Sequence, residues 1–219
     1  MTVLTKQLSA LSREALRRHF FALPADDIRL RFGSSMSGEG IDAYVDKVDF
    51  DRDAVFGVFD NDLQLIGVAH LALDPEHDAA ELGVSVLLGH RGRGVGTALF
   101  ERAEGHARNH YIKILFMHCL TENQPIMHIA QKSGMRVVTG AGESDAHLEL
   151  TPPDAANVTD ELMQERVALW DIALKAQFRS AKKIATAMAG KGADELQRAV
   201  GMQAAQKHVD AEKSKQGDE

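Results

Sequence analysis

Three glycines at alternate positions, Gly92, Gly94 and Gly96, stand directly before a segment whose apolar residues recur at helical spacing. Their spacing does not match the G-x-G-x-x-G pattern of dinucleotide-binding turns. The segment does not match the P-loop pattern either, because Val95 and Gly96 stand where Lys and Ser/Thr are required. The segment 91–96, read as Arg-Gly-Arg-Gly-Val-Gly, instead suits a tight turn between a strand and a helix. Backbone N–H groups and the positive end of the helix then converge on one point, where a pyrophosphate can sit.

Other side chains that could bind a metal or act as nucleophiles give weaker signals. His106 and His110 are four residues apart, which places both on one face of a helix, but no Glu follows His106 and no third ligand is evident. Exposed surface is therefore favoured for both histidines, and no metal site is expected. Cys119 alternates with apolar residues, so packing in a core strand is favoured over reactivity.

Alternating helical and strand patterns position the glycine segment. The expected elements are, in order, a helix over 11–23, a short helix from 24, a helix over 38–47, strands over 53–60, 63–74 and 80–88, a helix over 98–111, a strand over 111–120, a helix over 124–133, and strands over 135–138 and 146–150. This order predicts a mixed α/β fold. At its centre, a strand, the glycine turn, a helix and a second strand follow one another.

A second architecture begins after Thr151, because the prolines at 152 and 153 end the last strand and cannot lie inside a helix. An apolar stripe from Met163 to Met188 keeps helical spacing, and a weaker Ala-rich helix follows it. The expected divisions are a domain at 1–150, a linker at 151–157, a helical hairpin at 158–212 and a disordered tail at 213–219. The stripe needs a cover, which the first domain, the partner helix or another subunit in a homodimer could supply.

Composition narrows the class of protein. The chain has 219 residues, 44% of them hydrophobic and 26% charged, which is enough for one core and an appendage. A net charge of −7 argues against a nucleic-acid partner. No apolar run approaches the roughly 20 residues that cross a bilayer, so no membrane span is expected. A single cysteine and the lack of an apolar leader at the N-terminus predict a cytoplasmic protein.

Across nearly all of residues 1–150, the chain resembles the GNAT superfamily of acyl-CoA N-acyltransferases. Besides the glycine segment, the strand AELGVSVL resembles the family's central strand, Asn123 stands where the family often has Asn, and Gly134-Met135 matches its Gly-Phe ending. HFFALPADDIRLRF, Glu81 and NQPIMHIAQKSGM resemble more closely the GNAT domain of Pat-type bacterial protein lysine acetyltransferases. The resemblance implies a mixed, mostly antiparallel sheet flanked by helices, here with a C-terminal α-helical extension.

The same resemblance implies acetyl-CoA as cosubstrate and a primary amine, on a protein lysine or a small molecule, as acceptor. The residues it assigns to acetyl-CoA are Val84, Val86, Arg91, Gly92, Arg93, Gly94, Val95, Gly96, Thr97 and Asn123. The Val86 N–H would donate to the thioester oxygen. Glu81 would deprotonate the amine, directly or through water, from a largely apolar cleft. A structural carboxylate at the strand end is the alternative for Glu81.

One position departs from the family's pattern. Many members have a Tyr seven residues after the Asn, as the acid toward the leaving thiolate, but this chain has Ala130 there. His128 could substitute, although a solvated helix histidine is the favoured reading. The thiolate can also leave unprotonated, since the pKa of a thiol is about 8.5. The expected function is N-acetyl transfer, and a CoA-binding sensor without turnover is the alternative.

Overall fold

The computed structural model describes residues 3–74, 76–140, 142–153, 159, 161 and 163–180. The chain divides into two units, Met1–Ala173 and Leu174–Glu219. The fold that positions the candidate site belongs to the first unit.

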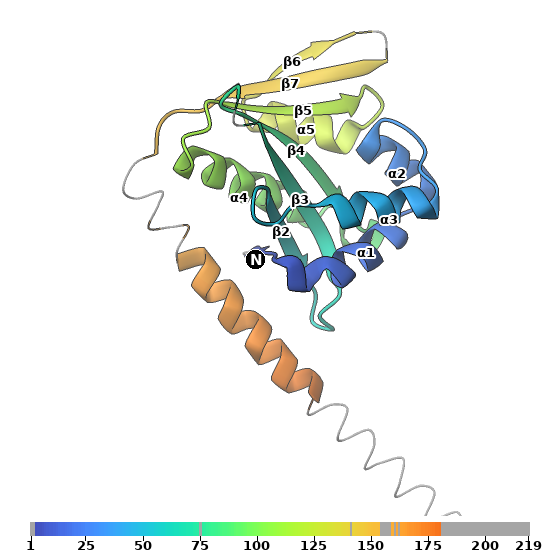
Figure 1. Ribbon diagram of the computed structural model, residues 1–219, viewed down its shortest axis with the longest axis vertical. Helices are drawn as coiled ribbons and strands as arrows, with labels where there is room; N and C mark the ends of the chain where they lie inside the picture. The colour runs from blue at the N-terminus through green and yellow to red at the C-terminus, as the bar shows by residue number, and fades with distance from the viewer. Residues whose placement is uncertain are drawn as a thin grey trace, which may run out of the picture. The chain divides into compact units, whose positions relative to one another are not determined.

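Seven described strands form one sheet in the order β1-β2-β3-β4-β5-β7-β6 (Figure 1). The elements in chain order are β1 Lys6–Gln7, η1 Ala10–Ser12, α1 Arg13–Phe21, α2 Ala25–Phe32, α3 Gly38–Lys47, β2 Ala54–Phe59, β3 Leu65–Asp74, β4 Ala79–Val86, η2 Leu88–His90, α4 Val95–Asn109, β5 Ile114–Leu120, α5 Gln124–Lys132, β6 Arg136–Thr139 and β7 Glu143–Glu149. Neighbouring strands of this sheet are antiparallel except for β4 and β5, which are parallel and are connected through α4.

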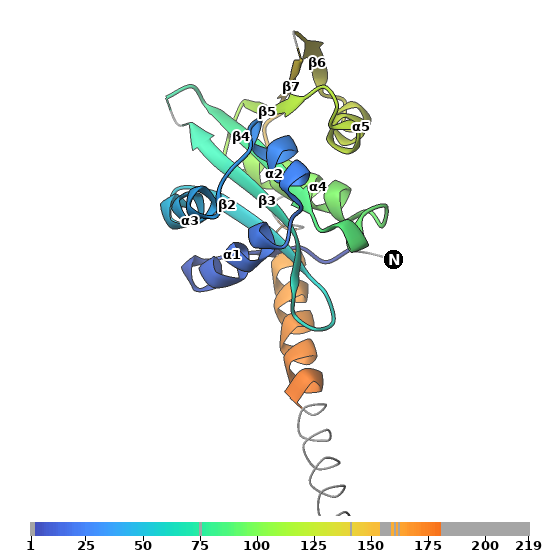
Figure 2. The same ribbon diagram turned by 90° about the vertical axis from the view of Figure 1, so that its right-hand side faces the viewer.

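Helices cover both faces of the sheet. Helices α1 and α3 lie together on one face, and α4 crosses the other (Figures 1 and 2). Phe20 of α1 and Val45 of α3 are fully buried on the first face, and Leu99 and Phe100 of α4 are fully buried on the second. The hydrophobic core therefore lies in two layers, one on each side of β2, β3 and β4.

Local signals in the sequence mark the ends of helices α2 and α5. Helix α2 begins after Pro24 and ends at Gly33, whose left-handed φ of 76° suits glycine. Helix α5 begins after Asn123, whose side chain accepts the N–H of Ile126, and Pro125 occupies its first turn. Such caps are visible in the sequence, and the expected elements up to residue 150 are confirmed with small shifts at their ends. Strand β1 was not expected, because two residues are too short to show a period.

The C-terminal extension begins as a helix, with residues 163–180 helical. Glu161 ion-pairs with the buried side chains of Arg102 and His106, and Glu165 accepts the N–H of Gln7. Burial alone would raise the pKa of Glu161, but hydrogen bonds from His106 and Asn109 lower it to about 2. These contacts fasten residues that precede Ala173 to α4 and β1.

The other expectations for this end of the chain remain predictions. The second helix of the predicted hairpin and the tail at 213–219 lie outside the described residues, as does most of the predicted linker. Within residues 3–180, as far as they are described, no helix combines the length and apolar character that a membrane span requires.

His19 links the first helix layer to the sheet from a buried position. Its Nδ1–H donates to the Leu65 carbonyl at 2.9 Å, so the neutral ring accepts the Ser85 hydroxyl at Nε2, at 2.8 Å. Burial lowers the pKa of His19 from 6.5 to about 4. One side chain thus ties α1 to both β3 and β4, in its uncharged form.

We predict that this linkage makes the fold sensitive to acid. The unfolded chain binds a proton at His19 below about pH 6.5 and the folded chain only near pH 4, so stability falls as pH drops through that window. The loss should be on the order of 3 kcal/mol. Urea unfolding at several pH values, for wild type and His19→Gln, isolates the effect because other groups titrate alike in both. Parallel stability curves would refute it.

Candidate active site

Strands β4 and β5 pair only over their first residues. The paired positions are Ala79 with Ile114, Ala80 with Leu115 and Glu81 with Phe116. Beyond Glu81, β4 continues to Val86 bonded to β3 alone. The sheet therefore opens at the C-terminal end of its parallel pair, the place where α/β sheets commonly bind ligands.

A cavity of about 420 Å³, here called the glycine-loop cavity, lies at this opening. It is lined by Leu23, Asp27, Leu30, Arg31, Val84, Ser85, Val86, Arg91, Gly92, Gly94, Val95, Gly96, Thr97, Asn123, Pro125, Ile126, His128 and Ile129. The structure thus gathers all the residues that the sequence assigned to acetyl-CoA except Arg93, which is exposed on the loop but does not line the cavity.

The glycine loop turns into α4 through left-handed backbone. Gly92 and Gly94 have φ values of 71° and 80°, and Gly94 is the N-cap residue of α4. A Cβ at residue 94 would meet no protein atom within 4 Å. Gly96, the second residue of α4, differs from Gly94, because a Cβ added there would lie 2.9 Å from Cδ1 of Ile129 on α5. Gly96 therefore lets α5 pack closely on α4.

The backbone of Val86 is turned toward the opening. The N–H of Leu87 donates to Ile66 on β3, and successive residues of a strand direct their peptide groups to opposite sides. The peptide groups of Val86 and Val84 consequently point away from β3, where β5 has already diverged. The Val86 carbonyl accepts Nε–H of Arg91 at 2.9 Å, in agreement with this direction.

Two of the assigned side chains already have partners within the protein. Arg91 ion-pairs with Asp27 of α2, so its charge is partly neutralised before any ligand binds. The Asn123 amide accepts the Ile126 N–H and donates to the Leu30 carbonyl at 3.2 Å. An amide has two donor hydrogens and two acceptor lone pairs, so Asn123 keeps capacity for a ligand while it joins α2 to α5.

A second cavity, of about 400 Å³, lies beside β4 and is here called the Glu81 cavity. It is lined by Arg31, Phe32, Gly33, Tyr44, His70, Ala72, Glu81, Gly83, His118, Cys119, Leu120, Glu143, Ser144 and Asp145. Glu81 is exposed in it, and its neighbours are largely polar, so the apolar cleft expected around this carboxylate is not found. Arg31 is the one lining residue that the two cavities share.

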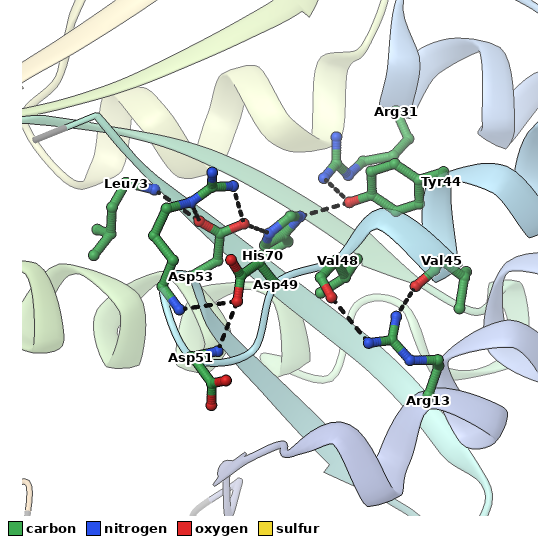
Figure 3. Close-up of polar contacts among 11 residues, drawn as sticks. Arg13, Arg31, Tyr44, Val45, Val48, Asp49, Asp51, Asp53, His70 and Leu73 are labelled. Atoms are coloured by element: carbon green, nitrogen blue, oxygen red, sulfur yellow. Dashed lines mark hydrogen bonds and ion pairs between the residues drawn. The ribbon is translucent and has the colours of Figure 1, made fainter.

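A partly buried chain of hydrogen bonds runs along one wall of the Glu81 cavity (Figure 3). The hydroxyl of Tyr44 and Nδ1 of His70 are 2.6 Å apart, and Nε2 of His70 lies 3.1 Å from Asp53. Asp53 also accepts from Arg52 and from the N–H of Leu73. Burial alone would raise the pKa of Asp53, but the bonds from His70 and Arg52 hold it well below its usual range. Burial raises the pKa of Tyr44.

Sequence reasoning missed Arg31, Tyr44 and His70. Each occupies an ordinary place in an amphipathic helix or an alternating strand, so no local motif marks it. His70 stands directly opposite Gly83 in the register of β3 and β4, and that pairing brings these residues together.

The remaining sequence candidates are placed as follows. Ala130 is buried in the core, whereas His128 is exposed and lines the glycine-loop cavity. His106 is buried against Glu161, contrary to the expected exposed surface, and the described residues include no cluster of three metal-ligating side chains. Cys119 is buried as expected, although it also lines the Glu81 cavity, and burial raises the pKa of its thiol.

Comparison with known proteins gives a consistent result. Residues 23–135 match the model of the acetyltransferase (GNAT) family. The GNAT domain of S. lividans PAT has 18% identity and a TM-score of 0.58, with coverage of 67% of this chain and 89% of that chain. Spermidine N-acetyltransferase from Vibrio cholerae, in complex with CoA and spermine, has 16% identity and a TM-score of 0.53, with coverage of 67% and 95%.

A third solved structure, the ribosomal-protein-S18-alanine N-acetyltransferase from Escherichia coli, has 13% identity and a TM-score of 0.54. Coverage is 70% of this chain and 97% of that chain. At these identities the solved structures establish a shared fold, which is the mixed, mostly antiparallel sheet with flanking helices expected from the sequence.

We predict that Gly94→Ala weakens CoA binding at least tenfold, or by about 1.4 kcal/mol, because its methyl group enters the space in front of the loop. Gly134→Ala is the matched control, since Gly134 also has a left-handed φ of 76°, has no atom within 4 Å of an added Cβ, and lines neither cavity. Both variants should lose similar thermal stability from backbone strain. Calorimetry with CoA should separate them, and equal affinities would contradict the loop's role.

Proposed function

This chain belongs to the acetyltransferase (GNAT) family, and we propose that it transfers an acetyl group from acetyl-CoA to a primary amine with Glu81 as general base. The position of Glu81 carries the proposal. It is the last residue of β4 that pairs with β5, and it lines a cavity that shares Arg31 with the glycine-loop cavity. A carboxylate there can accept a proton from an amine approaching the donor from the opposite side of the opening.

The glycine-loop cavity has the features that acetyl-CoA requires. The N–H groups from Gly92 to Gly96 and the N-terminus of α4 offer partial positive charge to the pyrophosphate. Arg93, exposed on the same loop, offers a full charge to a phosphate group. The backbone polar groups of Val84 and the N–H of Val86, turned away from β3, are available to the pantetheine arm and the thioester.

Proton and charge movements follow from these positions. Glu81 accepts a proton from the ammonium form of the acceptor, directly or through one water molecule, and the neutral amine attacks the thioester carbonyl. The Val86 N–H stabilises the negative charge that develops on the carbonyl oxygen. The C–S bond then breaks, and the nitrogen loses its second proton to the departing thiolate, directly or through water or His128, which lines the cavity on α5, so that the neutral amide and CoA are released.

The acceptor is a primary amine, on a protein lysine or on a small molecule. The closer sequence resemblance to Pat-type enzymes supports a lysine, and the exposed, polar Glu81 cavity is compatible with either. The single cysteine, Cys119, supports a reducing compartment such as the cytoplasm.

Glu81→Gln tests the base directly. The variant keeps the size of the side chain but accepts no proton, so kcat should fall by ~10²- to 10⁴-fold while the Kd for acetyl-CoA stays nearly unchanged. Part of the rate should return as pH rises, because the amine then loses its proton unaided. Thiol release across pH 6 to 10, with a panel of amines, measures both effects.

Glu143→Gln is the matched control, because it removes another carboxylate from the same cavity but lies on β7, which β5 separates from β4. It should change kcat by less than a few fold. Full turnover of Glu81→Gln at pH 7 would assign the base to another group. Wild-type protein that binds CoA but releases no thiol with any amine would favour the sensor function.

A further inference from the structure

The guanidinium of Arg31 occupies a subsite, here called the Arg31 subsite, that is formed by Gly83, Phe32 and Tyr44. A Cβ at residue 83 would fall on the guanidinium itself, so Gly83 leaves the room that it occupies on the face of the sheet. The carbon at its centre lies 4.8 Å from the centroid of the Phe32 ring. Its Nη2 makes a long hydrogen bond, 3.5 Å, to the Tyr44 hydroxyl. Glycine, ring and hydroxyl hold the cation in place without neutralising it.

The hydrogen-bond chain of Figure 3 orients the Tyr44 hydroxyl of this subsite. Asp53 accepts only, so in the neutral ring of His70 Nε2 carries the hydrogen of that bond and Nδ1 accepts the hydroxyl hydrogen of Tyr44. The oxygen of Tyr44 is then left to accept from Arg31. Each donor in the chain points toward Asp53, and the orientation of the hydroxyl is set before any ligand arrives.

Arg31 lacks a counter-ion among the described residues. No carboxylate oxygen in the described part of the chain lies within 4.0 Å of its nitrogens, although other arginines around the site are paired, Arg29 with Asp26 and Glu122 and Arg91 with Asp27. A half-buried cation without a partner is costly, and a planar guanidinium suits a carboxylate in two-point contact. The cavity therefore presents a prepared site for an anionic group.

We propose that Arg31 binds a carboxylate carried by the acceptor, so that the acceptor is a free amino acid or a similar small amino carboxylate. Phe32, Tyr44 and Gly83, which hold the guanidinium, all line the Glu81 cavity. Glu81 precedes Gly83 by two residues on β4, so its side chain lies on the same face of the sheet. One cavity thus offers an anion for the ammonium group and a cation for the carboxylate.

This proposal rests on the proposed amine acetylation, but direct binding can test it separately. The assay compares amino acids with the amines that lack only the carboxylate: lysine with cadaverine, phenylalanine with phenethylamine, histidine with histamine and tryptophan with tryptamine. The variants are Arg31→Met, which keeps a long side chain without its charge, and Gly83→Ala, whose methyl group takes the space of the guanidinium. Arg29→Met is the control on the same helix, because Arg29 lines neither cavity.

In at least one pair, the wild-type kcat/KM should be tenfold or more higher for the amino acid. Arg31→Met and Gly83→Ala should abolish that preference, mainly by raising KM for the amino acid, and should lower the amine's kcat/KM by a smaller factor. Arg29→Met should preserve the preference. A wild-type enzyme that favours the amine in every pair, or an Arg31→Met variant equally impaired with both members, would overturn the proposal.

Further measurements distinguish an acceptor carboxylate from an anionic group on the acyl chain or on CoA, and they also test the proposal if no acetylation is detected. A preference for succinyl-CoA over acetyl-CoA that Arg31→Met removes would place the carboxylate on the acyl group, and a tenfold loss of CoA affinity would place a phosphate at Arg31. Either result overturns the acceptor assignment. If no amine releases thiol, thermal shift with pooled amino acids and CoA still decides: stabilisation of wild type but not of Arg31→Met supports the proposal, and no stabilisation overturns it.

Discussion

The parting of β4 from β5 after the Glu81–Phe116 pair is the constraint on which the rest of the site depends. A strand inside a sheet normally forms hydrogen bonds with both neighbouring strands, but the second half of β4 has a neighbour on one side only. Polar backbone left unpaired in this way is costly unless water or a ligand satisfies it. The same parting that weakens the sheet thus supplies hydrogen-bonding groups and two cavities at one place.

Other contacts hold the opening in this form. His19 fixes the Leu65 and Ser85 ends of β3 and β4 to α1, so the free half of β4 is supported from one face of the sheet. On the other face, Gly96 lets α5 approach α4 closely. The Asp53–His70–Tyr44 chain joins the start of β2, β3 and α3 and keeps its polar atoms paired. Paired polar side chains on β3 and β4 thus support the strands from which β5 parts.

The glycine loop is the part of the candidate site that a local pattern in the sequence marks, because its glycines stand between a strand and a helix. Val84, Val86, Asn123 and Glu81 came from resemblance to a family, and all but Glu81 line the same cavity as the loop. The polar surroundings of Glu81 were not expected. Arg31, Tyr44 and His70 could not be inferred, because their meeting depends on sheet register and on how α2 and α3 cross the strands. A one-residue change in register would turn His70 to the opposite face.

Asn123 has a consequence for how the two cavities communicate. Its amide lines the glycine-loop cavity and holds the carbonyl of Leu30, the residue directly before Arg31, which borders both cavities. A displacement of Asn123 by a ligand in the glycine-loop cavity would pass through this hydrogen bond to the backbone beside Arg31. Thermodynamic linkage requires any such influence to be mutual and equal in free energy. One hydrogen-bonded side chain thus stands between the two cavities, and it gives the fold a direct route for coupling between their occupants.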